Sequence, residues 1–399
     1  MKTGQSRSSF LRCVVLVVTV ACAAAAAQVT VSAAEAPAPG RDESLLRESQ
    51  AAVDRGLRFL AQSQKENGSW QDQPAVTALV VTAMIGSGQE DYGVESRPVT
   101  AALDYIRSFA QPDGGIYDRF YQSYSTSICA MALVEAGLPG DKALLGKARA
   151  FLLGAQADES EGLSEDDIQY GGWGYEPHPS GEGMHGVDMS NTQFALEAIR
   201  ALEDIAEEDA AAAGTGEGGK TQTELAYGRA ITFLQRCQNL KAINDQPWAS
   251  DDGGFVYKPT ESKAGPTEDG GLRSYASMTY AGLKSMIYAR LDKNDRRVRA
   301  AHEWIRRHWS VRENPGLDQQ GLYYYYLTMG RALNAHGEDV VVDADGQAHD
   351  WRRELIDQLL TVQTGDGSWV NESGRWMETM PELVTAYAVL AVEHAWASW

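Results

Sequence analysis

The sequence predicts an all-α protein in which six inner and six outer helices close into a double ring. Two observations lead to this prediction. Amphipathic helices alternate along the chain with helices that are apolar on nearly every side, and one type of turn recurs between them. A helix that is apolar all round must be buried all round, so the second kind has to lie inside the first.

The recurring turn is clearest after Gln363, where Gly-Asp-Gly-Ser-Trp ends one helix and a more apolar helix follows. Glycine supplies the positive φ that a sharp exit from a helix needs. The same order of residues ends at Trp70 and, in a variant form, at Tyr117. Three copies of one turn predict a protein built from repeats.

The outer helices, with apolar residues three and four apart, are predicted at residues 45–64, 99–111, 142–156, 224–238, 296–310 and 351–363. The inner helices are predicted at residues 75–85, 126–136, 191–202, 275–288, 322–333 and 383–392. Because one pair of helices cannot bury its own apolar face, neighbouring pairs must stack. Six pairs can close on themselves, and an open superhelix is the structural alternative. Residues 157–190 and the low-complexity residues 207–223 are predicted to be loops.

Residues 1–34 are predicted to be a signal peptide, followed by a linker over residues 35–44 and the ring over residues 45–399. Three basic residues precede an apolar run from Cys13 to Ala27, and small residues at 32–34 offer a cleavage site. The run is shorter than the roughly 20 residues that a membrane-spanning helix needs. We therefore expect an exported protein, periplasmic or extracellular, with no transmembrane span in the mature chain. A lipid anchor at Cys22 is a weaker alternative.

The chain is acidic, with a formal net charge of −20 at pH 7. A field of this sign repels phosphate backbones, so we expect no nucleic-acid partner. Beyond the predicted signal peptide the only cysteines are Cys129 and Cys237, each inside a helical pattern. We expect two buried thiols, because neither a disulfide framework nor a paired-cysteine zinc pattern is present.

The turns after Gln64 and Gln363 resemble those of the squalene–hopene cyclase and prenyltransferase repeat superfamily, whose fold is an α/α toroid. The resemblance covers roughly residues 45–396. Short exported bacterial proteins of this type also carry stretches similar to residues 187–196 and 374–378. The resemblance implies an apolar ligand, of the isoprenoid class, in a central cavity.

Class II cyclases of that superfamily protonate an alkene with an acid in an Asp-x-Asp-Asp-Thr-Ala segment, and residues 188–193 resemble this segment. Asp188 matches its first aspartate, but Ser190 stands at the central acid and Asn191 at the next. A serine hydroxyl is too weak an acid to protonate an isolated double bond. We therefore expect no cyclisation of squalene. The structural alternative is a helix capping box from Ser190 to Gln193.

The zinc ligands of protein prenyltransferases, an Asp-x-Cys pair and a histidine, have no counterpart at residues 274–278 or 381–385. We expect no cofactor and no metal of that kind. One other cluster contains metal-ligating side chains, but glycine and proline between its members favour a solvated acidic loop: His178, Glu182, His185 and Asp188.

We expect the functional surface at the N-terminal ends of the inner helices, with Asp188 as the candidate catalytic residue. Candidate ligand-binding residues are polar groups at helix starts, tryptophans beside the turns and one of four consecutive tyrosines: Asn191, Trp173, Tyr275, Tyr325, Trp376 and Glu382. Helix capping by Asp and Glu accounts for part of this pattern. Three functions stay open: an isoprenoid-handling toroid, a non-catalytic extracytoplasmic binding or scaffold protein, and a toroid similar to polysaccharide lyases.

Overall fold

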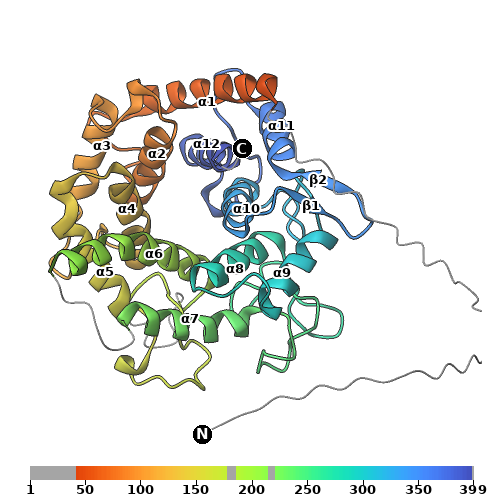
Figure 1. The fold of residues 1–399 in the computed structure, drawn as a ribbon. Helices are drawn as coiled ribbons and strands as arrows, with labels where there is room; N and C mark the ends of the chain where they lie inside the picture. Colours follow the sequence, from red (N-terminus) through yellow and green to blue (C-terminus); the bar gives the residue numbers. More distant parts are fainter. Residues whose placement is uncertain (1–41, 178–185, 214–220, 398–399) are drawn as a thin grey trace, which may run out of the picture. The chain divides into compact units, whose positions relative to one another are not determined.

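The two kinds of helix in the sequence form two concentric layers (Figure 1). A computed structural model describes residues 42–177, 186–213 and 221–397, and for residues 204–213 it describes the backbone alone. Over these residues it contains twelve α-helices and one two-stranded sheet. The all-α toroid that the sequence predicts is confirmed. Residues 1–34, the predicted signal peptide, lie outside the described part.

The outer layer consists of α1 (Glu43–Ser63), α3 (Arg97–Arg107), α5 (Lys142–Gly154), α7 (Gln222–Cys237), α9 (Arg296–Arg307) and α11 (Trp351–Val362). The inner layer consists of α2 (Pro74–Gly86), α4 (Gln122–Ala136), α6 (Met189–Ala213), α8 (Ala276–Tyr288), α10 (Leu322–His336) and α12 (Pro381–Trp396). Four single-turn 3₁₀ helices lie between them: η1 (Glu90–Tyr92), η2 (Pro139–Asp141), η3 (Glu159–Glu161) and η4 (Arg375–Met377).

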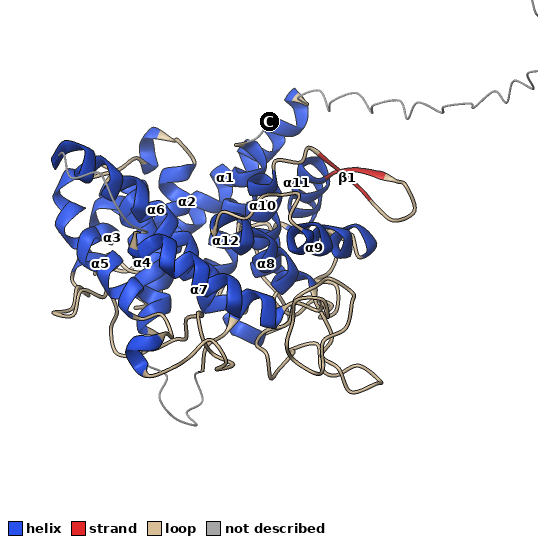
Figure 2. Cartoon of the chain, turned by 60° about the horizontal axis from the view of Figure 1, so that its bottom comes forward, coloured by secondary structure: helices blue, strands red, loops and turns tan. Residues whose placement is uncertain are grey.

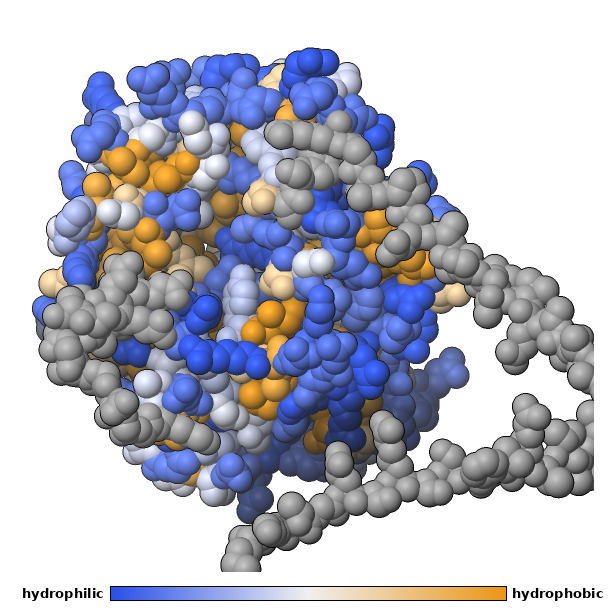
Figure 3. Space-filling model, in the orientation of Figure 1, coloured by the Kyte–Doolittle hydropathy of each residue, from blue (hydrophilic) through white to orange (hydrophobic). Residues whose placement is uncertain are grey.

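The ring closes where the last inner helix, α12, packs against α2 and α1. The indole nitrogen of Trp396 donates to the Ser49 hydroxyl across this junction at 3.0 Å. Gln363, after α11, donates from Nε2 to the carbonyl of Ala52 in α1 at 2.8 Å. Figure 3 shows mostly hydrophilic side chains at the rim of the ring and apolar patches beside a hollow near its middle.

Four of the six turns from an outer helix to the following inner helix share one set of hydrogen bonds. Gln64, for example, donates from Nε2 to the carbonyl of Gly68 in its own turn and to that of Pro98 in the next outer helix. The indole of Trp70 donates back to the carbonyl of Leu60 at 2.8 Å, which secures the ring over the turn. Equivalent glutamine bonds to two carbonyls occur at Gln156, Gln238 and Gln363.

Glycine is required where these turns touch the next outer helix. Gly171 has φ +91°, and a Cβ atom there would lie 1.9 Å from the carbonyl oxygen of Arg229. A threonine on the following inner helix then accepts from the backbone N–H of the aromatic or apolar residue that ends the turn, as Thr192 does from Trp173 at 3.0 Å. In these turns, residues close together in the sequence bond the end of an outer helix to the start of the inner helix that follows.

The structure differs from the sequence prediction in two places. Residues 207–213, expected to lie in a loop, continue α6 to Ala213, because an alanine- and glutamate-rich segment is a strong helix former; residues 214–220 lie outside the described part. A hairpin that was not expected, β1 (Val340–Val342) with β2 (Ala348–Asp350), joins α10 to α11.

Figure 2 shows that helices make up nearly all of the regular structure and that long loops gather at one end of the ring. None of the described helices combines the length and the apolar character that crossing a membrane requires.

Cys129 and Cys237 are buried and unpaired, as expected. Burial raises the pKa of both thiols, so neither is a reactive thiolate.

Candidate functional site

A cavity of about 270 Å³ lies at the N-terminal ends of the inner helices. Seven of its 14 lining residues are tyrosines, whereas the whole chain of 399 residues has only 17. The lining consists of Tyr121, Tyr124, Tyr175, Ser190, Tyr257, Lys263, Tyr275, Ser277, Met278, Tyr324, Trp376, Met377, Glu378 and Tyr387. This concentration of tyrosine marks the cavity as the candidate site, which we call the tyrosine cavity.

Backbone hydrogen bonds hold two loop tyrosines against the starts of inner helices. The carbonyl of Tyr175 accepts from Ser123 N at the start of α4, at 2.9 Å. The carbonyl of Tyr257 accepts from Met189 N at the start of α6, also at 2.9 Å. N–H groups in the first turn of a helix have no partner within the helix, so loop carbonyls can use them. The loops that carry these side chains are thereby fixed to the ring.

Aromatic rings form much of the cavity wall. The ring centroids of Tyr121 and Tyr175 lie 5.0 Å apart, edge to face, and those of Tyr124 and Phe194 lie 5.4 Å apart. The rings of Tyr324 and Tyr387 are edge to face, with centroids 6.3 Å apart. Such pairs contribute about 0.5–1.5 kcal/mol each beyond the area they bury, so the wall is held in shape by its own packing.

Three large side chains at the mouth of the cavity are exposed and have left-handed backbone conformations. Trp376, Met377 and Tyr121 are 42%, 46% and 46% exposed. Their φ angles are +57°, +63° and +58°. This conformation costs a non-glycine residue roughly 1–2 kcal/mol, and exposure of an apolar side chain recovers none of that cost. Strain of this kind is typical of functional sites.

Glu378 holds the strained segment in place. Its carboxylate accepts from the backbone N–H of Tyr324 at 2.8 Å and from Asn371 Nδ2 at 2.6 Å. Gly321, which precedes α10, has no side chain to cap the helix, and a Cβ there would lie 2.9 Å from the Trp376 ring. Glu378 therefore caps α10 while the indole of Trp376 covers Gly321. Burial raises the pKa of the Glu378 carboxyl.

Asp188 lies directly behind the cavity wall and is 1% exposed. Its Oδ1 accepts from Asn191 N at 2.9 Å and its Oδ2 from Asn191 Nδ2 at 2.7 Å, and the Tyr257 hydroxyl is a third hydrogen-bond partner. Burial raises the pKa of Asp188 to about 6, although these hydrogen bonds oppose the shift. Asp188 is thus the residue that caps α6, and both of its oxygens are engaged.

The capping box expected from Ser190 to Gln193 is wrong, because α6 begins at Met189, two residues earlier than predicted, and Asp188 caps it. Ser190 and Gln193 instead point their side chains at the hydroxyl of Tyr324, at 3.3 and 3.1 Å. Ser190, at the position that the resemblance gives to the cyclase acid, lines the cavity. The cavity therefore presents a hydroxyl at the place where a cyclase would have its proton donor.

The other sequence-predicted site residues divide into two groups. Tyr275 and Trp376 line the cavity. Asn191 is buried beside Asp188, and Glu382 accepts from Gln71 at 3.0 Å outside the lining. The loop cluster at His178, Glu182 and His185 lies outside the described residues.

Two further predicted residues, Trp173 and Tyr325, are buried outside the cavity lining. Trp173 is fully buried in a turn, where its indole donates to the Leu152 carbonyl at 2.7 Å. Tyr325 is fully buried, and its hydroxyl donates to the Ser310 carbonyl. Its neighbour Tyr324 lines the cavity instead, because consecutive residues on a helix point about 100° apart.

Sequence reasoning missed most of the cavity wall. The missed residues are Tyr121, Tyr124, Tyr175, Tyr257, Lys263, Ser277, Met278, Tyr324, Met377, Glu378 and Tyr387. One signal could have found several of them: a tyrosine occurs at or near the start of α4, α8 and α10, as at Tyr121, Tyr275 and Tyr323–Tyr326. The loop tyrosines carry no such signal.

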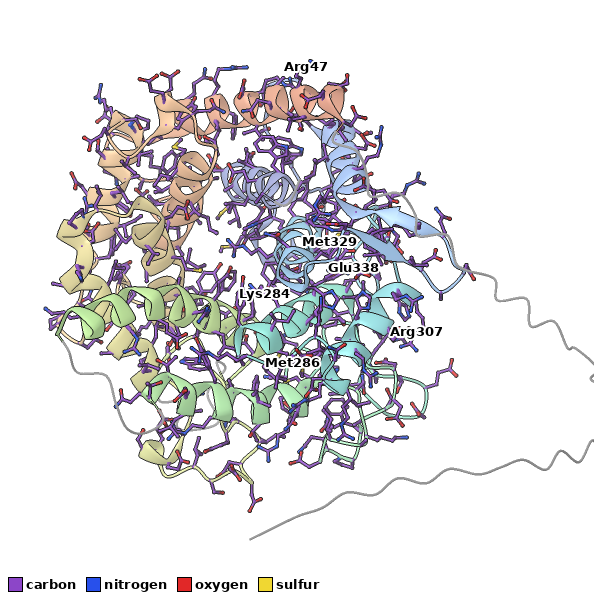
Figure 4. All side chains as sticks on the ribbon, viewed as in Figure 1. Arg47, Lys284, Met286, Arg307, Met329 and Glu338 are labelled. Carbon is purple, nitrogen blue, oxygen red and sulfur yellow. The ribbon has the colours of Figure 1, made fainter. Side chains whose placement is uncertain are left out.

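A second group of side chains meets inside the ring, away from the cavity lining, and we call it the ionic cluster: Glu197, Lys284, Arg331 and His394. Glu197 Oε2 lies 2.7 Å from Lys284 Nζ and 3.0 Å from Arg331 Nη1. Arg331 Nε also donates to His394 Nε2 at 3.0 Å. Figure 4 shows Lys284 at the inner side of the ring. Burial lowers the pKa of Lys284 to about 8 and that of His394 to about 3.

Comparisons with protein-family models and with curated proteins find no match. Solved structures do match. A variant of the type II terpene cyclase MstE from Scytonema, in complex with geranylgeranyl dihydroxybenzoate, aligns with a TM-score of 0.54 and 14% identity over 89% of this chain and 99% of that one. A variant of the same cyclase in complex with merosterolic acid A aligns with a TM-score of 0.51, 14% identity and the same coverage.

A polysaccharide lyase also aligns, with a TM-score of 0.52 and 11% identity over 88% of this chain and 97% of that one. At identities this low, the likeness shows a shared fold and leaves the activity open. The chain therefore has the α/α-toroid fold that is found in type II terpene cyclases and also in polysaccharide lyases.

Proposed function

We propose that the protein binds a neutral, elongated apolar ligand of the isoprenoid class in the tyrosine cavity. The observation that carries the proposal is the strained mouth, where Trp376, Met377 and Tyr121 are exposed in left-handed conformations beside an aromatic wall. A bound ligand that covers these apolar side chains would account for their strained backbone and their exposure to solvent. Pockets lined by aromatic groups with few polar ones are typical of small-molecule sites.

The charges in the lining favour a neutral ligand. Lys263 forms an ion pair with Glu261, and its ammonium lies 4.2 Å from the centroid of the Tyr257 ring. Glu378 is occupied in capping α10. Both charged residues of the lining are therefore already partnered within the described part of the chain. The tyrosine hydroxyls and Ser190 are neutral polar groups of the lining that could orient a ligand.

Binding is better supported than proton-initiated cyclisation. Protonation of an alkene requires a carboxylic acid that faces the substrate in its protonated form. Asp188 faces Asn191, and both of its oxygens accept hydrogen bonds. Ser190 lines the cavity but lacks the acidity that the reaction needs. Incubation with squalene is accordingly expected to yield no pentacyclic product, and such a product, if abolished by Asp188→Asn, would contradict this assignment.

A lyase-like function has less support. The polysaccharide lyase among the structural neighbours shares the fold at 11% identity. An acidic glycan would need unpaired cations beside the cavity, and Lys263 is the single cation in the described lining. A competition experiment with an acidic oligosaccharide distinguishes the two functions, because it should leave the binding of an isoprenoid probe unchanged.

Titration of the purified protein with a fluorescent farnesol analogue, followed by anisotropy, tests the proposal. Trp376→Ala is expected to weaken binding at least tenfold, or about 1.4 kcal/mol, because the indole covers the mouth. The matched control is Val370→Ala, since Val370 is also 42% exposed but does not line the cavity. Non-saturable binding to the wild type, or equal affinities for both variants, would contradict the proposal.

A further inference from the structure

Three metal-ligating side chains converge where the C-terminal end of α10 meets α9, away from the tyrosine cavity. His302 lies on α9, His336 is the last residue of α10, and Glu338 follows the glycine that caps this helix. Their candidate ligand atoms all lie within 4.8 Å of one another, and no other such trio of His, Cys, Asp or Glu occurs in the described part of the chain. Figure 4 places Glu338 by α10, apart from Lys284 at the ring centre.

The two imidazoles are aimed at the same carboxylate oxygen. Their rings stack with centroids 4.7 Å apart and an interplanar angle of 9°. His302 Nε2 contacts Glu338 Oε2, and His336 Nδ1 lies 3.6 Å from that same atom. Ligands bound to one tetrahedral zinc ion at roughly 2.0–2.2 Å are about 3.3–3.6 Å from each other. The spacing of His336 and Glu338 fits a shared ion, whereas the stacked imidazoles have to turn so that both ring planes contain the ion.

His336 Nδ1 is the observation that separates a metal site from an ordinary ion pair. This atom is buried, and it has no hydrogen-bond partner among the described residues. Leaving a buried polar atom unpaired costs about 1–3 kcal/mol. A hydrogen bond between His302 and Glu338 would not remove that cost, whereas a metal ion bound by all three residues would.

The backbone around the trio is held rigidly. Gly337 ends α10 in the left-handed conformation, and the carbonyl of Glu338 accepts from the indole of Trp351 at 2.7 Å. Trp351 itself is fully buried. The C-terminal end of a helix carries partial negative charge, which favours a cation. Both the fixed backbone and the electrostatics of α10 therefore suit a bound metal.

We propose that His302, His336 and Glu338 bind a divalent transition-metal ion of the Zn²⁺ type. Two imidazoles and one carboxylate are a ligand set that zinc uses with a fourth, open position. The fourth position would face a hollow of about 620 Å³ that the three ligands share with Lys293, Arg296 and Arg299. Mg²⁺ and Ca²⁺ prefer oxygen ligands and fit this set poorly.

The basic side chains around the hollow repel a free metal ion, so we expect a moderate affinity rather than that of a structural zinc site. An anion in the hollow would offset this repulsion and could occupy the open position.

The test is isothermal titration of the metal-free, tag-free protein with Zn²⁺ alone. We expect one ion per chain, and His302→Ala and Glu338→Gln should each weaken binding at least tenfold. His308→Ala is the matched control, because His308 lies at the end of the same helix with its ring stacked on Trp304. Co²⁺ in place of Zn²⁺ should give the visible absorption of a four-coordinate site in the wild type and not in Glu338→Gln.

Absence of binding to the wild type would overturn the proposal. So would unchanged stoichiometry and affinity in His302→Ala and Glu338→Gln, which would place the ion elsewhere in the chain. Thermal melts of both metal-free variants check that they are folded, and Glu338→Gln keeps the size of the side chain. Binding of the farnesol analogue should be unaffected in these variants, so the two proposals fail independently.

Discussion

The tyrosine cavity and the ionic cluster are both built from inner helices, but they use polar groups in opposite ways. In the ionic cluster each charge has a partner: Glu197 pairs with Lys284 and Arg331, and Arg331 bonds to His394. In the tyrosine cavity the backbone is strained and apolar side chains face solvent at the mouth. The comparison indicates that the cluster stabilises the ring and that the cavity is available to a ligand.

The largest effect is expected from Lys284→Met in the ionic cluster. Removing one partner of a buried ion pair typically costs about 3–5 kcal/mol, because the remaining charge is left buried. Arg331 still pairs with Glu197 in this variant, so we expect a loss of about 3 kcal/mol in urea unfolding. The control is Lys263→Met in the cavity, whose partner Glu261 is 40% exposed; its cost should stay under about 1 kcal/mol. A stable Lys284→Met protein would contradict the structural role of the cluster.

The next largest effect is a dependence of the free energy of unfolding on pH, which comes from His394 in the ionic cluster. Burial lowers the pKa of His394 to about 3, from a reference value of 6.5. Between these values the unfolded chain binds a proton that the folded protein does not, so stability is lost as pH falls below 6.5. The contribution amounts to about 2 kcal/mol between pH 7 and pH 5. His394→Gln should remove this component of the pH profile of unfolding, and His308→Gln should leave it in place.

Asp188, behind the cavity, should show a smaller dependence of opposite sign. Its pKa is raised by burial from 3.8 to about 6. The folded protein therefore binds the additional proton between these values, and the stabilisation is present at low pH and lost as pH rises through 6. The contribution of Asp188 to the free energy of unfolding changes by about 1 kcal/mol between pH 7 and pH 5. Asp188→Asn should abolish it, and an unchanged pH profile in that variant would show that the carboxyl is not protonated in this range.

The smallest effect is expected from Met377→Gly at the mouth of the cavity. Glycine adopts the left-handed conformation without the roughly 1–2 kcal/mol that methionine incurs there, but it loses more entropy on folding. We expect a net stabilisation of about 0.5 kcal/mol together with weaker binding of the farnesol analogue. The prediction is tested by measuring both quantities, because stability should increase while affinity for the farnesol analogue decreases. Destabilisation with unchanged binding would show that the strain has no connection with a ligand.

The positions of the helices and of the turns could be predicted from the sequence. Periodicity located the starts of the twelve described helices to within a few residues, because burial on one side or on all sides leaves a local pattern. The turn after Gln363 could likewise be recognised, since the glycine, the glutamine and Trp369 lie within a few residues of each other in the chain. Only the hairpin at Val340–Asp350 and the C-terminal extension of α6 departed from this reading.

Which side chains form the candidate site depends on the tertiary structure. Trp173 and Trp376 both follow a glycine closely in sequence, yet one is fully buried in a turn and the other is 42% exposed at the cavity mouth. Likewise, the rotation of α10 against its neighbours brings Tyr324 rather than Tyr325 to the cavity. The physical reason is that a cavity wall is assembled from segments far apart in the chain. Which face of each segment points inward depends on packing between helices, and no single segment records it.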